Sequence, residues 1–426
     1  MNREAVAIAA DRGVSIVTGP PENPQEIITS ATKIFGLPQD HAVSFMIYNN
    51  ATFLGIPWEP LITRFGESLG PSPLPALADY ADRFLTFLRD ERDLITPAIE
   101  QQYFTSLIYT YYLAFRKIFQ ESASETIRQL GVINEDQVGE FVAGKVNELF
   151  IGIASASPLP GIAPSFIQEL STAYDAVTTR AISEVFEQLP IPDQARAQLK
   201  EIPFLYYATF GGSADPSSRT FSGIAITGFG KQEIFPSLIA YAIEGRLAGT
   251  LKYRETKNKK ITLETGAWVI PFEHQEMVEI FMSGIDPHLT DALVGSLSEV
   301  FNEYPQAIID SIETMDDEEK ANVKNRFQPK TDELVTRIST YMTNYRASNA
   351  APVINVVVSL PKPELAAMAE SLVSLTSLKR KVSANPGMPG GAIEVAVVSK
   401  QDGLVWIRRK PYFDRVLNPQ AWQKRS

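Results

Sequence analysis

Histidine, the commonest general base, is scarce in this sequence, which has only His41, His274 and His288. A Ser-His-Asp triad would have to use one of these three as its base. No Gly-x-Ser-x-Gly segment is present that would place a serine on a strained turn. Glu273 and Asp286 add oxygen ligands beside two of the histidines, but their spacing fits no zinc motif, which favours a surface cluster. We therefore expect neither a metal nor a cofactor site.

The sequence also argues against thiol chemistry and against the binding of a dinucleotide. Cysteine is absent, which removes thiolate nucleophiles, disulfides and thiolate metal sites together. Gly228-Phe229-Gly230 follows an expected strand, yet the third glycine of a dinucleotide fingerprint is missing and another strand follows. We interpret this segment as a tight turn. No Walker-type phosphate loop occurs.

Charge and hydropathy limit the classes of partner. The net charge is -11 and the pI is about 5.0, so the overall field repels a phosphate backbone and argues against nucleic acid. Two short basic runs, Lys379–Lys381 and Arg408–Lys410, are interpreted as a solvated helix end and an edge strand. Tyr103–Phe119 is the most apolar long segment, but Arg116 and Lys117 interrupt it, so a packed helix is favoured over a membrane span. No leader pattern is recognised, and we expect a soluble, cytoplasmic protein.

The first secondary-structure elements that the sequence predicts are strands. Short apolar or alternating runs predict strands at Ala5–Ala10, Val14–Val17, Lys33–Phe35 and Val43–Ile47. Tyr48–Ala51 supplies turn chemistry, and Pro57 opens a helix. From about 74 to 204 the apolar residues recur at three- and four-residue spacing, which predicts helices around a core that includes the aromatic stripe.

After a turn-rich joint at Gly211–Ser218 the strand pattern returns. We expect strands at Gly223–Phe229 and Phe235–Ile243, a tight turn at Glu244-Gly245 into Arg246–Tyr253, and a continuing meander over Lys259–Ile270. Helices are expected near Gln275–Met282 and Asp291–Tyr304, after the acidic cluster Asp316–Glu319, and over Pro363–Lys379. Asp402-Gly403 between two apolar runs predicts a final hairpin.

The order of these elements resembles the proteasome β-subunit and its bacterial relatives, which are N-terminal-nucleophile hydrolases. Five weak motifs in matching order support the resemblance, which covers roughly residues 1–70, 220–290 and 360–410. They are Ala9-Ala10-Asp11-Arg12, Lys33-Ile34-Phe35, Met46–Ala51, Ile224–Phe229 with Pro236–Leu238 and Glu244-Gly245, and Gly390-Gly391 leading into Ile393–Val398. The resemblance implies an α+β fold, a four-layer αββα sandwich, enlarged here by a large helical insertion.

The chemistry of that family is specific. A chain-terminal Thr, Ser or Cys attacks an amide carbonyl, and its own α-amine acts as general base. A lysine ammonium favours the deprotonated nucleophile, and an aspartate holds that lysine. By resemblance, Lys33 matches the lysine and Asp11 the aspartate; the alternative is an ordinary buried pair on strands.

Three departures argue against catalysis. The chain starts Met1-Asn2, and Ser15 and Thr18 lie inside it, so no nucleophile stands at the end. The family's Asp-x-x-Ser-Gly-Gly support motif falls on Pro386–Gly391, with prolines at both polar positions. Its Gly-Ser-Gly has no match near Val269–His274.

The predicted organisation has five segments. The first part of the sandwich spans 1–73, a helical insertion 74–210, the central hairpins and a helix 211–290, a second helical insertion 291–350, and the final helix and hairpin 351–426. The resulting hypothesis is an inactive or latent proteasome-like protein that acts as a homo-oligomeric scaffold or binds a protein or peptide. Two alternatives stay open: an active amidase or peptidase whose true N-terminus lies upstream of Met1, and a protein-binding module that uses the insertion at 74–210.

Overall fold

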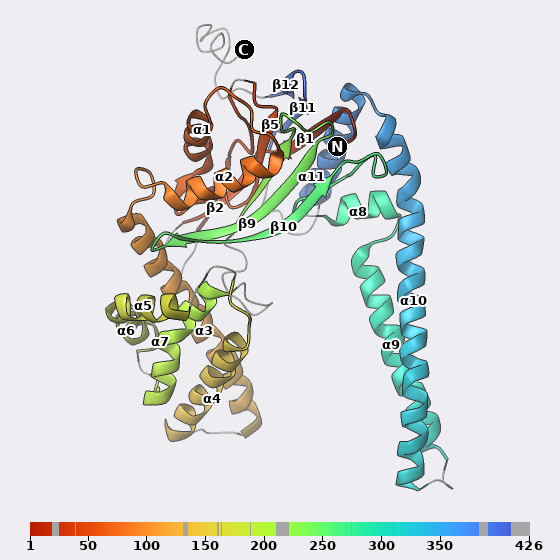
Figure 1. Ribbon diagram of the computed structural model, residues 1–426. Coiled ribbons are helices and arrows are strands. Elements are labelled where there is room, and N and C mark those ends of the chain that lie inside the picture. Colours follow the sequence, from red (N-terminus) through yellow and green to blue (C-terminus); the bar gives the residue numbers. More distant parts are fainter. Residues whose placement is uncertain are drawn as a thin grey trace. The chain divides into compact units, whose positions relative to one another are not determined.

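The structure is a computed structural model, and it describes residues 1–18, 25–38, 40–130, 135–159, 162, 164–187, 189–209, 221–273, 275–312, 314, 316–382 and 391–409. The chain is mixed α+β and forms two compact units (Figure 1). Unit 1 contains Met1–Arg12, Ile234–Pro236 and Lys259–Ser426, and unit 2 contains Gly13–Glu233 and Ser237–Asn258.

Unit 2 is built on a five-stranded antiparallel sheet in the order β10-β9-β8-β5-β4. Its strands are β4 (Ile34–Gly36), β5 (Val43–Asn49), β8 (Ser222–Gly228), β9 (Ser237–Leu247) and β10 (Thr250–Lys260). Two small hairpins accompany it: β2 (Gly13–Thr18) with β3 (Gln25–Ser30), and β6 (Thr52–Phe53) with β7 (Ile56–Pro57). The expected left-handed turn residue after β5 is present, because Asn49 has φ 66°.

Two helices cover this sheet with an aromatic core. They are α1 (Trp58–Ser68), which begins directly after Pro57 as expected, and α2 (Leu77–Asp90). Phe45 on β5 packs edge-to-face against Phe84 of α2 with ring centroids 4.8 Å apart, and Phe65 of α1 meets the same ring at 5.0 Å. The amphipathic spacing in these helices therefore serves packing on the sheet.

The rest of unit 2 is a separate helical core. It consists of α3 (Pro97–Leu130), α4 (Glu135–Ala154), α5 (Pro164–Ala173), α6 (Asp175–Phe186) and α7 (Asp193–Ala208). Phe104, Tyr111 and Phe115 of α3 are fully buried in it. The aromatic stripe of the sequence is thus core, as its helical spacing indicated.

The expected turn at Glu244-Gly245 is wrong. β9 runs on to Leu247, and the chain turns at Ala248 and Gly249, whose φ angles are 47° and 77°. Gly245 lies inside the strand because the Tyr103 ring occupies the space of a side chain there: an added Cβ would lie 2.6 Å from its Cε1. The glycine that marked a turn in the sequence is a close-approach position instead.

Unit 1 contains a three-stranded antiparallel sheet in the order β1-β11-β12. Its strands are β1 (Ala5–Asp11), β11 (Ile393–Ser399) and β12 (Gly403–Arg408), so the Asp402-Gly403 hairpin is confirmed. Ala7 pairs with Val397 across the first two strands. Its helices are α8 (Glu276–Ser283), α9 (Pro287–Asp310), α10 (Asp317–Ser359) and α11 (Lys362–Val382).

Local signals for the helices of unit 1 are also confirmed. Asp316 and Glu319 form a reciprocal capping box at the start of α10, so the acidic cluster does mark a helix N-terminus. Leu365 of α11 packs with Ala5 and Val397 of the sheet and with Val357 at the end of α10. The Lys259–Ile270 meander is shorter than expected, because β10 ends at Lys260 and only an isolated bridge, Asn2 with Ala267, follows.

Some of the five predicted segments lie within one unit, and others are divided between the two. The segment 74–210 holds α2–α7, all in unit 2, whereas 211–290 is divided between β8–β10 in unit 2 and α8 in unit 1. The helix pair predicted within 291–350 extends further at both ends, from Pro287 to Ser359. No helix in the described part of the chain is both long enough and apolar enough to cross a membrane.

Candidate interaction surface

Asp11 forms an ion pair with an arginine of the C-terminal part of the chain. It ends β1, and its side chain is 8% exposed. Arg380, in the last turn of α11, donates from Nη1 to Asp11 Oδ2 at 3.1 Å. The ion pair therefore ties the end of the strand to the C-terminal end of the helix, where a cation is also favoured by the helix dipole.

Lys33, the other expected catalytic residue, belongs to unit 2, while Asp11 belongs to unit 1. Lys33 directly precedes β4 and is partly buried, and its carbonyl accepts a hydrogen bond from the Ile47 N–H at 2.8 Å. The expectation that Lys33 and Asp11 act as a pair thus stays a prediction. The prolines at the expected support motif, Pro386 and Pro389, lie outside the described residues.

The α-amine of Met1 is buried in unit 1. It donates to the Trp268 carbonyl at 2.8 Å, and burial lowers its pKa to about 5. Asn2 fixes the same segment, since its Nδ2 donates to the carbonyls of Val357 and Leu360 at 3.0 and 2.8 Å. The N-terminal segment of unit 1 is thus held by backbone and side-chain hydrogen bonds.

The histidines that the structure describes do not form a triad. His41 is buried, with Nδ1 2.7 Å from the Tyr80 hydroxyl and Nε2 2.9 Å from the Gly70 carbonyl. Because a carbonyl only accepts, Nε2 carries the proton and Nδ1 accepts from the tyrosine. His288 lies 3.7 Å from Glu276, and His274 lies outside the described residues. No cluster of three or more metal-ligating side chains occurs among the described residues.

The most deeply buried charges of unit 2 also serve structure. Arg246 on β9 is fully buried and donates to Glu100 Oε1 at 2.5 Å and to four carbonyls, those of Leu88, Arg89, Glu91 and Ile95. Two of these carbonyls lie in the last turn of α2, so the guanidinium acts as a C-cap. Because all three nitrogens of the guanidinium are bonded within the fold and the side chain is fully buried, this cluster serves structure.

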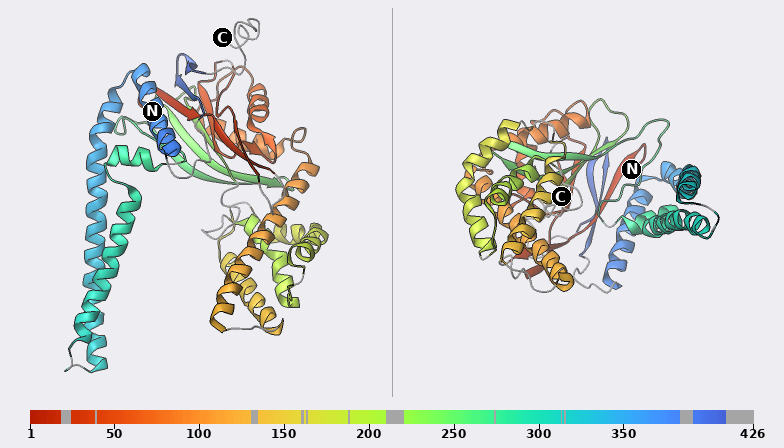
Figure 2. Two further views of the ribbon diagram at one scale, coloured as in Figure 1. Left: turned by 180° about the vertical axis from the view of Figure 1, so that it is seen from behind. Right: turned by 90° about the horizontal axis from the view of Figure 1, so that it is seen from below.

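A different feature stands out in unit 1: α9 and α10 form an antiparallel helical hairpin. The two helices lie side by side along the length of α9 in both side views (Figures 1 and 2). Gln328 donates to the Asn302 side chain at 3.2 Å, and Thr331 donates to the Phe301 carbonyl at 3.3 Å. These contacts fix the level at which residues of α9 and α10 face one another.

Both helices carry a second apolar stripe besides the one at their mutual seam. On α9 every exposed apolar residue directly precedes a residue at or near the seam: Leu289, Leu293, Val300, Tyr304 and Ile308 precede Thr290, Val294, Phe301, Pro305 and Ile309. On α10 Phe327, Leu334, Tyr341 and Tyr345 precede Gln328, Val335, Met342 and Arg346 in the same way. Successive helical residues are rotated by about 100°, so each stripe lies about a quarter-turn from the seam.

The common offset places both stripes on one side of the hairpin. Since the helices run in opposite directions, the same rotation about each helix axis turns both stripes toward the same face. We call these nine residues the apolar face. Tyr304 and Tyr341 are 67% and 65% exposed, and Tyr341 stacks on Tyr345 with ring centroids 6.4 Å apart. Contiguous exposed apolar side chains of this kind mark interaction sites.

The helical core of unit 2 gives a contrasting picture. Among those of its residues whose exposure the structure describes, which leaves out 125–130 of α3, Ile151 is the one large hydrophobic residue with substantial exposure. Its apolar residues are directed inward, to the core around Phe104, Tyr111 and Phe115. The helical insertion at 74–210 is thus self-contained, and the sequence-based alternative that makes it a binding module finds less support than the hairpin.

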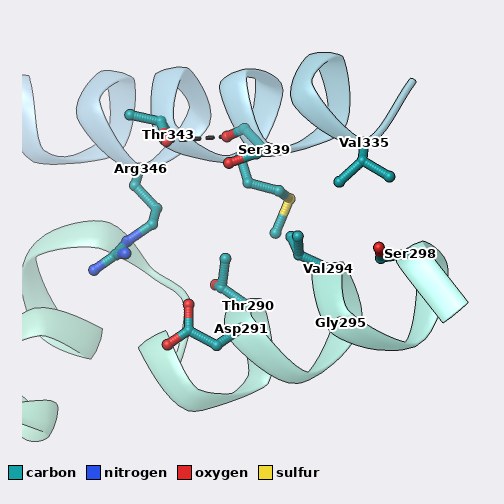
Figure 3. A pocket seen from close by; sticks show the side chains of 10 residues that line it. Thr290, Asp291, Val294, Gly295, Ser298, Val335, Ser339, Thr343 and Arg346 are labelled. Carbon is teal, nitrogen blue, oxygen red and sulfur yellow. Dashed lines mark hydrogen bonds between the residues drawn. The ribbon is translucent and has the colours of Figure 1, made fainter. Parts of the chain in front are cut away.

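The opposite side of the hairpin is hollow and more polar. A groove of about 450 Å³ lies between the helices there, lined by residues that include Asp291, Gly295, Thr343 and Arg346 (Figure 3). A Cβ added at Gly295 would meet nothing within 4 Å, so the two helices are not tightly packed at that level. Arg346 is held by Glu279 of α8, with Nη2 3.0 Å from Oε2. The groove is therefore wide and open, with no deeply buried polar group aimed into it.

Sequence reasoning did not find the apolar face. The signal was present, because Phe327, Leu334 and Tyr341 recur at seven-residue spacing and Leu289, Leu293, Val300 and Tyr304 at spacings of four and seven. Such spacing is equally typical of a helix that buries one stripe in a core. Only the exposure of these side chains distinguishes the two cases.

Comparison with known proteins gave no assignment. A scan against protein-family models found no match, and searches of curated proteins and of solved structures also found none. The function has to be inferred from the chain's own geometry.

Proposed function

We propose that this chain is a divergent relative of the N-terminal-nucleophile hydrolases that works as a self-assembling scaffold and not as a hydrolase. Two features support the relationship: antiparallel sheets of five and three strands, and a chain order in which the first strand β1 pairs with β11, the first strand of the final hairpin. The four-layer sandwich is part of this proposal.

The proposal that hydrolysis is absent follows from departures inside the sequence. Prolines stand at both polar positions of the family's Asp-x-x-Ser-Gly-Gly motif, and its Gly-Ser-Gly has no match near Val269–His274. Catalysis by this family needs a hydroxyl or thiol next to a free amine and a lysine held by an aspartate. Asp11 also pairs with Arg380, which gives it a structural role at the end of β1.

The observation that carries the scaffold proposal is the apolar face of the α9–α10 hairpin. Two helices bury only one stripe each against one another, and the second stripe of each is left to solvent. The occupant we propose is a second copy of this chain. α9 has four acidic residues and no Lys or Arg. α10 begins with three acids, Asp317–Glu319, but its following part, Lys320–Arg346, contains six Lys or Arg and two acids, so beyond the tip the two helices are complementary in charge.

Light scattering on the full chain tests this proposal. We expect a concentration-dependent dimer or higher oligomer for the unchanged protein. Val300→Glu places a carboxylate in the middle of the apolar face and should weaken association at least tenfold, which corresponds to about 1.4 kcal/mol. Thr336→Glu is the matched control, because Thr336 is exposed and lies on the other side of the same hairpin. It should leave association unchanged.

Two results would contradict the proposal. One is a monomer at every concentration tested, measured on protein whose circular dichroism shows a folded chain. The other is equal weakening by Val300→Glu and Thr336→Glu, which would mean that the apolar face has no special role.

A further inference from the structure

The apolar face also determines how two copies would pair, an inference that rests on the proposed self-association. Two identical faces related by a twofold axis can stack in two ways. In the first, α9 lies on the partner's α10, and both hairpin tips point in the same direction. In the second, α9 lies on the partner's α9 and α10 on the partner's α10, with the tips opposed. We use "tip" for the end of the hairpin at Asp310 and Asp317.

The outer edges of the hairpin carry opposite charges. With about 100° per residue, Glu299, Glu303 and Asp310 fall on the edge of α9 that is farthest from α10 and borders the apolar face. By the same geometry Arg326, Lys330 and Arg337 fall on the outer edge of α10, together with two carboxylates, Glu333 and, near the tip, Glu319, so the edge is basic on balance away from the tip. All eight side chains are exposed.

These charges are largely unneutralised within the chain. Glu299, Glu303, Arg326 and Arg337 make no ion pair with any residue in the described ranges. Lys330 pairs with Glu333 one turn away at 3.1 Å, an exposed contact of the kind that contributes little. The edges are therefore available to a partner.

We infer that two copies pair with α9 on the partner's α10 and with both tips on the same side. In this arrangement the acidic edge of α9 meets the basic edge of the partner's α10. In the other arrangement acidic edge meets acidic edge and basic meets basic, and like charges brought together oppose association.

The hydrogen bonds between α9 and α10 show which residues lie at the same height along the hairpin axis, so the inference can be stated for single residues. Asn302 is hydrogen-bonded to Gln328, so Glu303 lies within about half a turn of Arg326 along the hairpin axis. A twofold axis parallel to the helices keeps each residue at its level. Glu303 of one copy then faces Arg326 of the second copy, although within one chain the two are on opposite edges.

Disulfide formation between two single-cysteine variants gives a direct test. The natural chain has no cysteine, so each variant contains one thiol. Ser296→Cys lies on α9 beside the apolar face, and Leu334→Cys lies on α10 at a similar level. Under mild oxidation we expect a mixture of the two variants to form heterodisulfide dimers, with little homodisulfide in either variant alone. Thr336→Cys mixed with Ser296→Cys is the control and should stay reduced.

A charge swap gives the second test. Glu303→Arg and Arg326→Glu, made singly, should each weaken association about fivefold at low salt, since each places like charges together. The double variant restores opposite charges in reversed order, and its association should return to within about twofold of the unchanged chain. At high salt the three variants should converge.

The outcomes separate this inference from the proposed function. Association together with homodisulfides, or without any heterodisulfide, would overturn the arrangement while leaving self-assembly intact. Failure of the double charge variant to recover would also overturn it. A folded protein that stays monomeric would overturn both.

Discussion

Replacing the buried Arg246 should destabilise unit 2 strongly, and the structure allows the size of the effect to be worked out. Arg246→Met retains much of the apolar stem but removes every donor of the guanidinium. Glu100, whose side chain is 5% exposed, then loses its 2.5 Å partner, and four carbonyls lose a donor. Breaking a buried ion pair from one side costs about 3–5 kcal/mol, because the other charge stays buried.

We expect a loss of about 4 kcal/mol, a large part of the stability of an ordinary domain. Urea unfolding followed by circular dichroism and by tryptophan fluorescence measures it, with Trp58 reporting on unit 2 because it is buried there. Arg89→Met is the matched control: the Arg89 side chain pairs with Asp90, and both side chains are exposed, so its removal should change little.

A second variant tests whether the loss comes from the interaction between Arg246 and Glu100 or from the altered Arg246 side chain alone. Glu100→Gln alone should also destabilise, and the double variant should lose less than the sum of the two single losses, because the carboxylate and guanidinium depend on one another. A loss below about 1 kcal/mol for Arg246→Met, or strictly additive losses, would refute the view that this network holds β9 to α2 and α3.

Three further predictions concern other positions. Gly230→Ala should lower the free energy of unfolding, measured with denaturant, by about 3 kcal/mol, because the new Cβ would lie 2.3 Å from Ala76 Cα. Gly295→Ala has open space around it and should raise the free energy of unfolding by up to about 1 kcal/mol through helix propensity. Similar effects of the two variants would contradict the reasoning. When Met1 carries a free α-amine, its pKa of about 5 lies below the unfolded value of 8.0, so stability should rise by about 2 kcal/mol from pH 6 to pH 8, and a flat profile in that window would show that the amine is not buried. Asp11→Asn should lower stability by about 1–2 kcal/mol without altering self-association in light scattering, because Asp11 anchors α11 through Arg380; unchanged stability would argue against that role.

Much of the local structure could be predicted from the sequence, because local rules govern it. Asp316 with Glu319 marked the start of α10, and Asp402-Gly403 marked the last hairpin, since capping and turn preferences depend on neighbouring residues only. Glu244-Gly245 misled for the opposite reason. Glycine is needed at position 245 because the ring of Tyr103, which is distant in the sequence, lies against it, and not because the chain turns there.

The candidate site could not be predicted in the same way. Asp11 and Lys33 were singled out by resemblance, and their pairing stays a prediction; that Arg380 also pairs with Asp11 depends on where α11 ends, which no local pattern around Asp11 indicates. Resemblance identifies residue types in an order. It does not determine which side chains meet.

The sequence by itself determined that the chain is α+β, where its last hairpin turns, and that helices lie near Asp291–Tyr304 and after Asp316–Glu319, because periodicity and capping are properties of short segments. Only the tertiary structure decided that the stripes of Val300 and Tyr341 are exposed on one face of a hairpin. The physical reason is that periodicity reports an apolar stripe but not what covers it. Whether such a stripe becomes core or interface depends on which elements, in this chain or in a second copy, come to lie against it.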